Sequence, residues 1–299
     1  MTNSALGRPV WSPAARYRRS LWLLTVRDLR VRYSTSVLGY FWSILDPLVM
    51  AAIYWFVFTQ VFDRTVGAQP YIVFLLTALL PWMWFNGATS DATRAYLREA
   101  KLIRSTKIPR TIWVARLVLS KGIEFVASIP VVVIFAIATG ATLQWEAALL
   151  PLALVLQAVL TMGVGLIVAP LVVFFRDLER ATKLALRFLF YASPIIYGLS
   201  DLPSGLHFWA TFNPLAGIFS LYRSAFFPEQ LDWFAVGMAA IISAIIFCVG
   251  VLVFARTERA VLKEIYPTQS VPVSPPPMTT TSLPVALSAG FVPSNLWSS

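Results

Sequence analysis

The chain has 299 residues, of which 58% are hydrophobic and 13% are charged, and its formal net charge is +10. Soluble domains carry about 25% charged residues, so this composition excludes an ordinary soluble fold and predicts an all-helical integral membrane protein. Lys and Arg collect in cytoplasmic loops, and no nucleic-acid partner is expected. Because Cys248 is the only cysteine, the chain cannot form an internal disulfide. With one cysteine and one histidine, His207, a metal site built from Cys or His is not expected.

Residues 1–35 form a basic segment ahead of the first predicted span, and we expect them to be cytoplasmic and interfacial. Apolar residues between positions 16 and 33 recur at helical spacing and form one stripe: Trp22, Val26, Leu29 and Tyr33. Arginines, Arg27 and Arg30 among them, lie largely on the other faces. This pattern predicts an amphipathic helix that lies flat on an anionic leaflet; the alternative is a soluble helix packed on a partner protein.

Residues 36–256 contain the predicted transmembrane domain. A spanning helix needs about 20 mostly apolar residues. Five segments meet this description, in chain order: 37–61, 71–87, 112–138, 147–175 and 233–255. A sixth candidate, 184–199, is short and carries Arg187 near its start.

Charge asymmetry predicts the topology. Four segments expected in the cytoplasm hold 22 of the 24 Lys and Arg residues: 1–36, 88–121, 176–187 and 256–266. Both termini are therefore placed in the cytoplasm, which requires an even number of crossings. Six crossings satisfy this rule if 184–199 spans, whereas five would place the basic cluster after residue 255 outside.

The stretch 200–230 has too many aromatic residues and prolines for an ordinary loop or a full span. Two short helices around an Asn-Pro pair predict a re-entrant hairpin, and irregular backbone at membrane depth is tolerated only against protein or a water-filled cavity. An amphipathic external cap is the alternative. The candidate cavity-lining residues here are Phe208, Trp209, Phe212, Asn213, Pro214, Phe219 and Tyr222.

The loop 91–110 is predicted to form a short amphipathic cytoplasmic helix that Pro109 ends. One face is apolar, with Ala92, Tyr96, Ala100 and Ile103. The opposite face is basic, with Arg94, Arg98 and Lys101. Such a helix is expected either to dock on a cytosolic partner or to lie on the membrane surface.

No catalytic constellation is found in the sequence. There is no G-x-x-x-x-G-K-[ST] pattern, so ATP hydrolysis by a phosphate loop is not expected on this chain. We predict no catalytic residue, no metal site and no cofactor of its own. Two acids fall within predicted spans, Asp46 beside Pro47 and Glu124 three residues after Lys121. A Lys121–Glu124 pair is favoured over a proton pathway.

Aromatic residues deep in the predicted spans suggest a path for a glycan, because aromatic faces stack on the C–H faces of sugar rings. The candidate channel residues are Tyr54, Trp55, Phe58, Tyr191 and Tyr197. After the last span, residues 257–299 form a cytoplasmic tail. Its part 267–299 has seven prolines and no charge, and this composition predicts disorder.

Short segments in a fixed order give the chain a resemblance to a known family. They are residues 27–33, 36–39, 101–104, 107–110, 175–178, 213–215 and 222–223. From about Trp22 to Arg259 the chain resembles the permease subunit of ABC-2 type polysaccharide exporters, which export O-antigens, teichoic acids and related lipid-linked glycans. Within that family it most resembles the mycobacterial-type galactan exporters. Asp46 and Ile108 depart from the pattern, where relatives often carry Gln and Phe.

The resemblance implies a homodimer in the bacterial inner membrane that docks two copies of a separate ATPase, which binds ATP and Mg. The helix at 91–110 is then the main coupling helix, with Arg94, Tyr96, Arg98, Lys101, Ile103, Arg104 and Pro109. Arg176 and Asp177 form a second cytoplasmic contact. The N-terminal helix borders a lateral gate for the lipid-linked substrate, and residues 200–230 form the outer gate. The competing functions are an ABC-2 permease for a small molecule or drug, a proton-coupled secondary transporter and a non-transporting scaffold.

Overall fold

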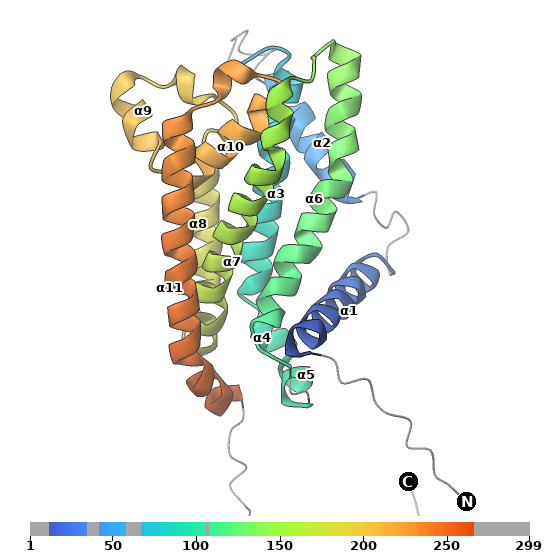
Figure 1. The fold of residues 1–299 in the computed structure, drawn as a ribbon, viewed down its shortest axis with the longest axis vertical. Coiled ribbons are helices and arrows are strands. Elements are labelled where there is room, and N and C mark those ends of the chain that lie inside the picture. The colour runs from blue at the N-terminus through green and yellow to red at the C-terminus, as the bar shows by residue number, and fades with distance from the viewer. Residues whose placement is uncertain (1–11, 35–41, 58–66, 106–107, 266–299) are drawn as a thin grey trace, which may run out of the picture. The chain divides into compact units, whose positions relative to one another are not determined.

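In the computed structural model, residues 12–34, 42–57, 67–105 and 108–265 are described, and every regular element within these ranges is a helix. Figure 1 shows a bundle of long helices with short helices at both ends. The α-helices are α1 (Pro13–Ser34), α2 (Trp42–Trp55), α3 (Tyr71–Ala92), α4 (Ala95–Arg98), α5 (Ala100–Ser105), α6 (Ile112–Thr139), α7 (Leu150–Phe174), α8 (Leu178–Ala192), α9 (Ser204–Ala210), α10 (Pro214–Ser224) and α11 (Trp233–Ile265). Three 3-10 turns join them: η3 (Trp145–Leu149), η4 (Leu199–Asp201) and η5 (Pro228–Gln230).

Four of the predicted spans are helices long and apolar enough to cross a membrane. They are Tyr71–Ala92, Ile112–Thr139, Trp145–Phe174 and Trp233–Glu258. The remaining two predicted spans are shorter in the described ranges. Helix α2 has 14 residues, and the predicted span 37–61 extends beyond the described residues on both sides. Helix α8 has 15 residues, or about 22 Å at 1.5 Å per residue, and bends follow it.

Helix α3 occupies the centre of the bundle. Its sequence is apolar on all sides, which is typical of a helix surrounded by protein, and 78% of its most apolar window is buried, against 22% for α11. Helices α2, α6, α7, α8 and α10 all pack against it. The outer helices therefore expose apolar side chains, as expected for surfaces that face lipid.

Glycines allow two helix pairs to approach closely. A Cβ atom on Gly163 of α7 would lie 2.7 Å from the Phe247 nitrogen of α11, and one on Gly217 of α10 would lie 2.1 Å from the Ala235 carbonyl oxygen. Membrane helices commonly pack through such small residues, because apolar lipid gives no hydrophobic drive for association.

Helix α10 is buried along nearly its whole length, and Arg223 anchors the irregular chain beside it. The Arg223 guanidinium donates to the carbonyl oxygens of Ile195 at 2.8 Å and Tyr197 at 3.1 Å, and it stacks on Phe74 at 3.7 Å. Asn213 caps the helix by accepting from the Leu215 N–H at 3.0 Å. The two predicted short helices around Asn213 are thus α9 and α10.

Helix α1 runs obliquely past the lower end of the bundle and packs mainly on α6 (Figure 1). The predicted apolar stripe is only partly buried. Leu29 and the polar Thr25 face the protein, whereas Trp22 is 55% exposed. The predicted stripe is thus divided between the bundle and the outer surface, and charged residues of α1 form ion pairs with the bundle.

Candidate functional site

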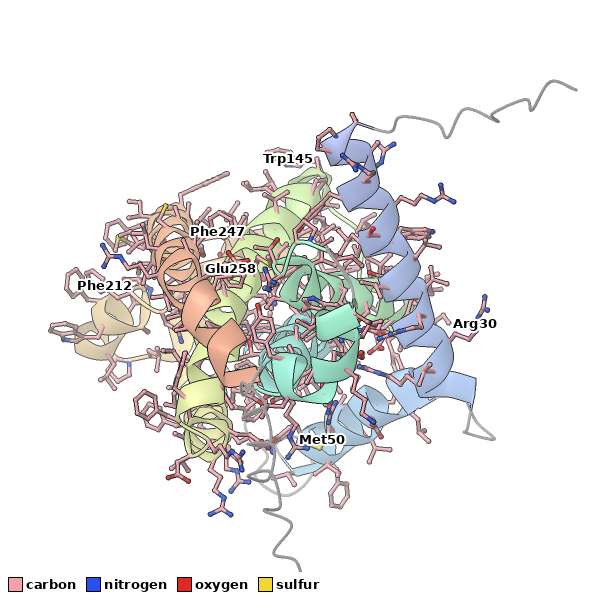
Figure 2. All side chains as sticks on the ribbon, turned by 90° about the horizontal axis from the view of Figure 1, so that it is seen from below. Arg30, Met50, Trp145, Phe212, Phe247 and Glu258 are labelled. Carbon is pink, nitrogen blue, oxygen red and sulfur yellow. The ribbon has the colours of Figure 1, made fainter. Side chains whose placement is uncertain are left out.

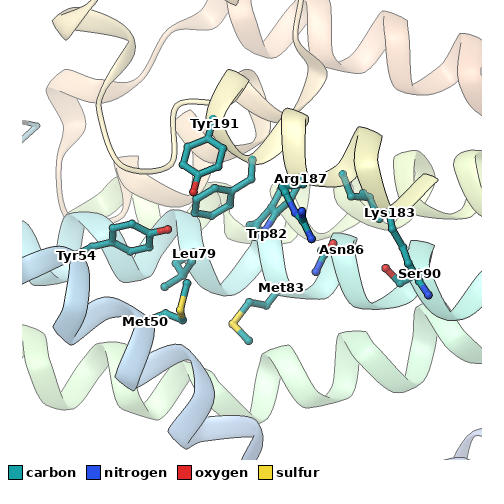
Figure 3. Close-up of a pocket in the computed structure, with 12 residues that line it drawn as sticks. Met50, Tyr54, Leu79, Trp82, Met83, Asn86, Ser90, Lys183, Arg187 and Tyr191 are labelled. Atoms are coloured by element: carbon teal, nitrogen blue, oxygen red, sulfur yellow. The ribbon is translucent and has the colours of Figure 1, made fainter. Parts of the chain in front are cut away.

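A groove of about 550 Å³ lies between α2, α3 and α8. Each helix contributes side chains at helical spacing, so each presents one face to the groove. The lining comes from α2 (Met50, Tyr54), α3 (Leu79, Trp82, Met83, Asn86, Ser90) and α8 (Lys183, Leu186, Arg187, Phe190, Tyr191). Figure 3 shows these side chains meeting from the three helices.

One end of the groove is aromatic. Phe190 is the centre of a ring cluster, with centroid distances of 5.9 Å to Tyr54, 5.5 Å to Trp82 and 5.1 Å to Tyr191. In Figure 3 the hydroxyl groups of Tyr54 and Tyr191 are turned toward one another across the groove. Rings with polar tips can stack on a sugar and hydrogen-bond its hydroxyl groups. Two of the predicted channel aromatics, Tyr54 and Tyr191, thus line this groove.

The other end of the groove is basic and polar. Lys183 and Arg187 from α8 lie opposite Ser90 and Asn86 from α3 (Figure 3). No carboxylate is part of the lining that the described residues form. The groove thus changes from cationic to aromatic along its length.

The other predicted channel and gate residues lie outside this groove. Trp55 is exposed on α2, and Tyr197 donates its hydroxyl to the Tyr191 carbonyl oxygen at 3.2 Å. Phe208, Trp209 and Phe212 form an exposed ring cluster on and beside α9, and Figure 2 shows Phe212 at the rim. Phe58 falls outside the described residues.

Phe219 and Tyr222 differ from the prediction, because the structure places them in the protein core. They are 0% and 4% exposed on α10. Tyr222 packs edge-on against Phe125 of α6, with ring centroids 5.4 Å apart. The prolines and aromatic residues around α10 predicted a re-entrant hairpin that lines a cavity, whereas these two side chains pack into the core, where Gly217 allows α10 to approach α11 closely.

The predicted coupling helix is two short helices rather than one. Helices α4 and α5 are separated at Glu99, whose φ of −105° and ψ of 15° depart from helical values. The predicted faces are nonetheless present. Tyr96 and Ile103 are buried, whereas Arg98 and Lys101 are exposed. The Arg104 side chain is outside the described part. Helix α5 ends at Ser105, earlier than the predicted end at Pro109, which lies between α5 and α6.

An ion-pair cluster joins this coupling segment to α1, and we call it the Arg116 cluster. Arg116 of α6 contacts Asp28 of α1 at 2.6 Å and Glu99 at 3.3 Å. Arg27 of α1 contacts the same two carboxylates, at 2.6 Å to Glu99 and 3.3 Å to Asp28. The Arg116 side chain is only 4% exposed, so the cluster is a partly buried connection between three elements.

A second ion-pair cluster joins the coupling segment to the groove. The Nε of Arg94, just before α4, donates to Glu179 of α8 at 2.8 Å. Glu179 also accepts from Lys183 at 2.6 Å, and Lys183 lines the groove. Hydrogen bonds from Arg94 and Lys183 lower the pKa of Glu179 to about 2. The carboxylate therefore stays ionised and connects the two basic residues at neutral pH.

Glu124 is paired, as predicted. It contacts Lys121 at 2.8 Å and also Arg32 of α1 at 2.9 Å. Arg32 reaches Asp91 at 3.0 Å as well. With two cationic partners, Glu124 fits a structural ion pair better than a proton carrier.

The predicted second cytoplasmic contact, Arg176 and Asp177, is exposed in the short turn between α7 and α8. Arg30 points away from the bundle in the view of Figure 2, whereas the Tyr33 side chain is outside the described part. Within the described ranges, no three His, Cys, Asp or Glu side chains group closely enough to hold a metal ion.

The sequence profile of the family described as ABC-2 type transporter matches residues 19–227 of the chain. The chain belongs to this family. The matched region of the ABC-2 chain runs from α1 to the end of α10, so it contains the groove and both ion-pair clusters. ABC-2 membrane proteins are transport subunits rather than enzymes.

Curated relatives of this ABC-2 chain are polysaccharide transport proteins. It is 35% identical over 238 residues to the O-antigen export system permease protein RfbA of Klebsiella pneumoniae, covering 79% of this chain and 91% of the relative. It is 28% identical to the protein of the same name from Myxococcus xanthus, covering 72% and 83%. It is 25% identical to the polysialic acid transport protein KpsM of Escherichia coli, covering 80% and 93%.

Several groove residues of the ABC-2 chain were missed by sequence reasoning. Lys183 and Arg187 were counted only as cytoplasmic charge, and Asn86 and Ser90 were not considered. The spacing of Lys183, Arg187 and Tyr191 at i, i+4 and i+8 places them on one helical face. That spacing was the available signal.

Proposed function

We propose that the chain is the permease subunit of an ABC transporter that exports a lipid-linked polysaccharide across the bacterial cytoplasmic membrane. Likeness to an O-antigen export permease and a polysialic acid transport protein over most of both chains supports the substrate class. The observation that carries the proposal is the groove, because it combines sugar-stacking rings with polar groups inside an apolar bundle. ATP is hydrolysed by a separate ATPase subunit.

In this proposal two copies of the chain place their grooves face to face. The helices beside the groove expose large apolar residues, among them Ile53 at 50%, Leu184 at 67% and Phe188 at 74%. A second copy covers these side chains and closes the two grooves into one channel. The proposal includes six crossings per chain, with both termini in the cytoplasm.

Two copies of the ATPase dock on the cytoplasmic side, at α4, α5 and the turn containing Arg176 and Asp177. ATP-driven closure of the ATPase moves the coupling segment. The Arg116 cluster transmits this movement to α1, and Glu179 transmits it to α8. The gate for the lipid-linked substrate and the wall of the channel thus move together.

Depletion of the chain tests the function. Lipid-linked glycan is expected to accumulate on the inner leaflet, because it is still made but no longer exported. Unchanged cytoplasmic pools after depletion would contradict the exporter and favour an ABC-2 permease for a small molecule.

The double substitution Arg98→Glu with Lys101→Glu tests the coupling surface. Both side chains are exposed, and among the described residues the only ion pair of Arg98 is a long 3.9 Å contact with Asp91, so the fold is expected to survive. We expect ATPase docking and export to be lost while membrane insertion is normal. The matched control is Arg180→Glu, an exposed arginine on α8. Normal ATPase docking in the double variant would refute the coupling assignment.

A further inference from the structure

The basic end of the groove contains two cationic and two polar side chains, and among the described residues only Lys183 has a protein partner. Within the described ranges, Arg187 has no ion pair, and the side chains of Asn86 and Ser90 form no hydrogen bond. Lys183 has only Glu179, which Arg94 shares. Lys183 and Arg187 are exposed to the groove, and polar groups that face an apolar environment are costly unless they are satisfied. These four side chains lie together and open into one space (Figure 3).

Lys183 and Arg187 lie on successive turns of α8, and Arg187 falls within the fifth span of the proposed topology. Counting from the first residue of α8, Lys183 lies about 7 Å and Arg187 about 14 Å along the helix, at 1.5 Å per residue. Charged residues at membrane depth commonly mark substrate paths. Arg187 is flanked on α8 by the buried Leu186 and the exposed apolar Phe188, and no carboxylate in the described part of the chain forms an ion pair with it.

We propose that Arg187 and Lys183, with Asn86 and Ser90, form a subsite for the phosphate group of a lipid phosphate ester. All four side chains can donate hydrogen bonds, and the guanidinium fork of Arg187 matches two phosphate oxygens. Lys183 and Arg187 are one helical turn apart, about 6 Å, so both can contact one phosphate or two linked phosphates. Phosphate esters are the abundant anions of a bilayer, and the exposed apolar faces of α2 and α8 leave the groove open toward lipid.

The order of groups along the groove gives the subsite its place in transport. A lipid-linked glycan whose phosphate is held by Arg187 has its first sugars beside Tyr54, Tyr191 and Phe190. This deepens and rests on the proposed function. The same phosphate chemistry is also present in ordinary anionic phospholipids, so the test must separate the two sources.

Binding to the full chain in phosphatidylcholine nanodiscs tests the subsite without ATPase or glycan. The probes are farnesyl phosphate and farnesol, which differ only in the phosphate. Wild-type protein is expected to prefer farnesyl phosphate by at least about tenfold, since charged hydrogen bonds are the strong ones. The double variant Lys183→Gln with Arg187→Gln is expected to lose this preference, whereas Arg180→Gln, on the same helix outside the groove, keeps it.

Two further arms complete the experiment. Arg187→Lys keeps the charge without the fork and is expected to keep a smaller preference than wild type, which separates loss of the site from loss of the fold. Displacement of the probe by excess phosphatidylglycerol assigns the subsite to phospholipid headgroups, and resistance to it assigns the subsite to the lipid carrier of the substrate. The proposal is overturned if the folded double variant prefers farnesyl phosphate as wild type does. Because glycan pools are measured separately, either proposal can fail alone.

Discussion

Replacing Arg116 with alanine should loosen α1 from the bundle. Arg116 is the buried member of a cluster in which two cations share two carboxylates from different elements. Its removal leaves Asp28 and Glu99 held only by Arg27, which is 38% exposed and lies on α1 itself. Among the described residues, no other guanidinium of α6 contacts these two carboxylates, so the variant loses the connection between α6 and α1 in this cluster.

The size of the effect follows from burial. Removing one partner of a fully buried ion pair costs about 3–5 kcal/mol. Asp28 and Glu99 are 15% and 22% exposed and keep Arg27 as a partner, so water and Arg27 compensate part of the loss. We expect about 2 kcal/mol, which is about a thirtyfold change in the equilibrium between docked and undocked α1.

Hydrogen–deuterium exchange of the full chain in nanodiscs measures this equilibrium. Backbone amides of residues 16–34 should exchange up to about thirtyfold faster in Arg116→Ala, while those of 233–255 in α11 serve as an internal reference. Arg30→Ala is the matched control, because Arg30 is on α1, points away from the bundle and has no ion pair within the described ranges. With the ATPase added, Arg116→Ala should hydrolyse ATP with reduced export.

Unchanged exchange in α1, in a variant whose α11 is protected as in wild type, would refute this reasoning. The cluster would then contribute nothing to docking, and apolar contacts such as that of Leu29 would hold α1 alone. An equal effect of Arg30→Ala would also refute it, because the loss would then report net charge rather than the cluster.

Two further predictions concern packing and protonation. Gly217→Ala should destabilise the protein by about 1–3 kcal/mol, because the new Cβ atom meets the Ala235 carbonyl oxygen. Gly237→Ala, where nothing lies within 4 Å of the new Cβ atom, should be neutral or slightly stabilising. Thermal unfolding of the two variants measures the difference. The pKa of Glu179 is lowered to about 2, so its stabilising contribution is present above its ordinary pKa of 4.5 and is lost only as pH falls toward 2. In Arg94→Gln the pKa of Glu179 should rise toward 4.5. The ¹³C chemical shift of the Glu179 carboxyl group, followed between pH 6 and 3, measures this rise. An unchanged titration in the variant would show that Arg94 does not lower the pKa.

Sequence patterns predicted the helical class and the four long spans, because an apolar run of membrane length has few alternatives. The helix over 112–138 was predicted to within a residue of Ile112–Thr139. Length alone could not settle α8. Its first half is charged and its second half aromatic, so its pattern is amphipathic rather than uniformly apolar.

The candidate site was predicted only in part. Tyr54 and Tyr191 were selected for depth and chemistry, and both line the groove. Phe219 and Tyr222 share that chemistry but lie in the core, because the close approach of α10 to α11 depends on tertiary packing. Likewise, Glu99 breaks the coupling helix through contacts with residues far away in sequence, which local periodicity cannot reveal.

The charges on α8 have a consequence for how the protein is made. Lys and Arg at the centre of a helix each raise its insertion free energy by about 2.5–3.5 kcal/mol. Lys183 and Arg187 lie on a helix of only 15 residues, so α8 is not expected to partition into the bilayer unaided. We expect it to leave the translocon together with α7, once α3 is in place to present Asn86 and Ser90. Lys183 and Arg187 would then determine both the chemistry of the groove and the order in which the helices enter the membrane.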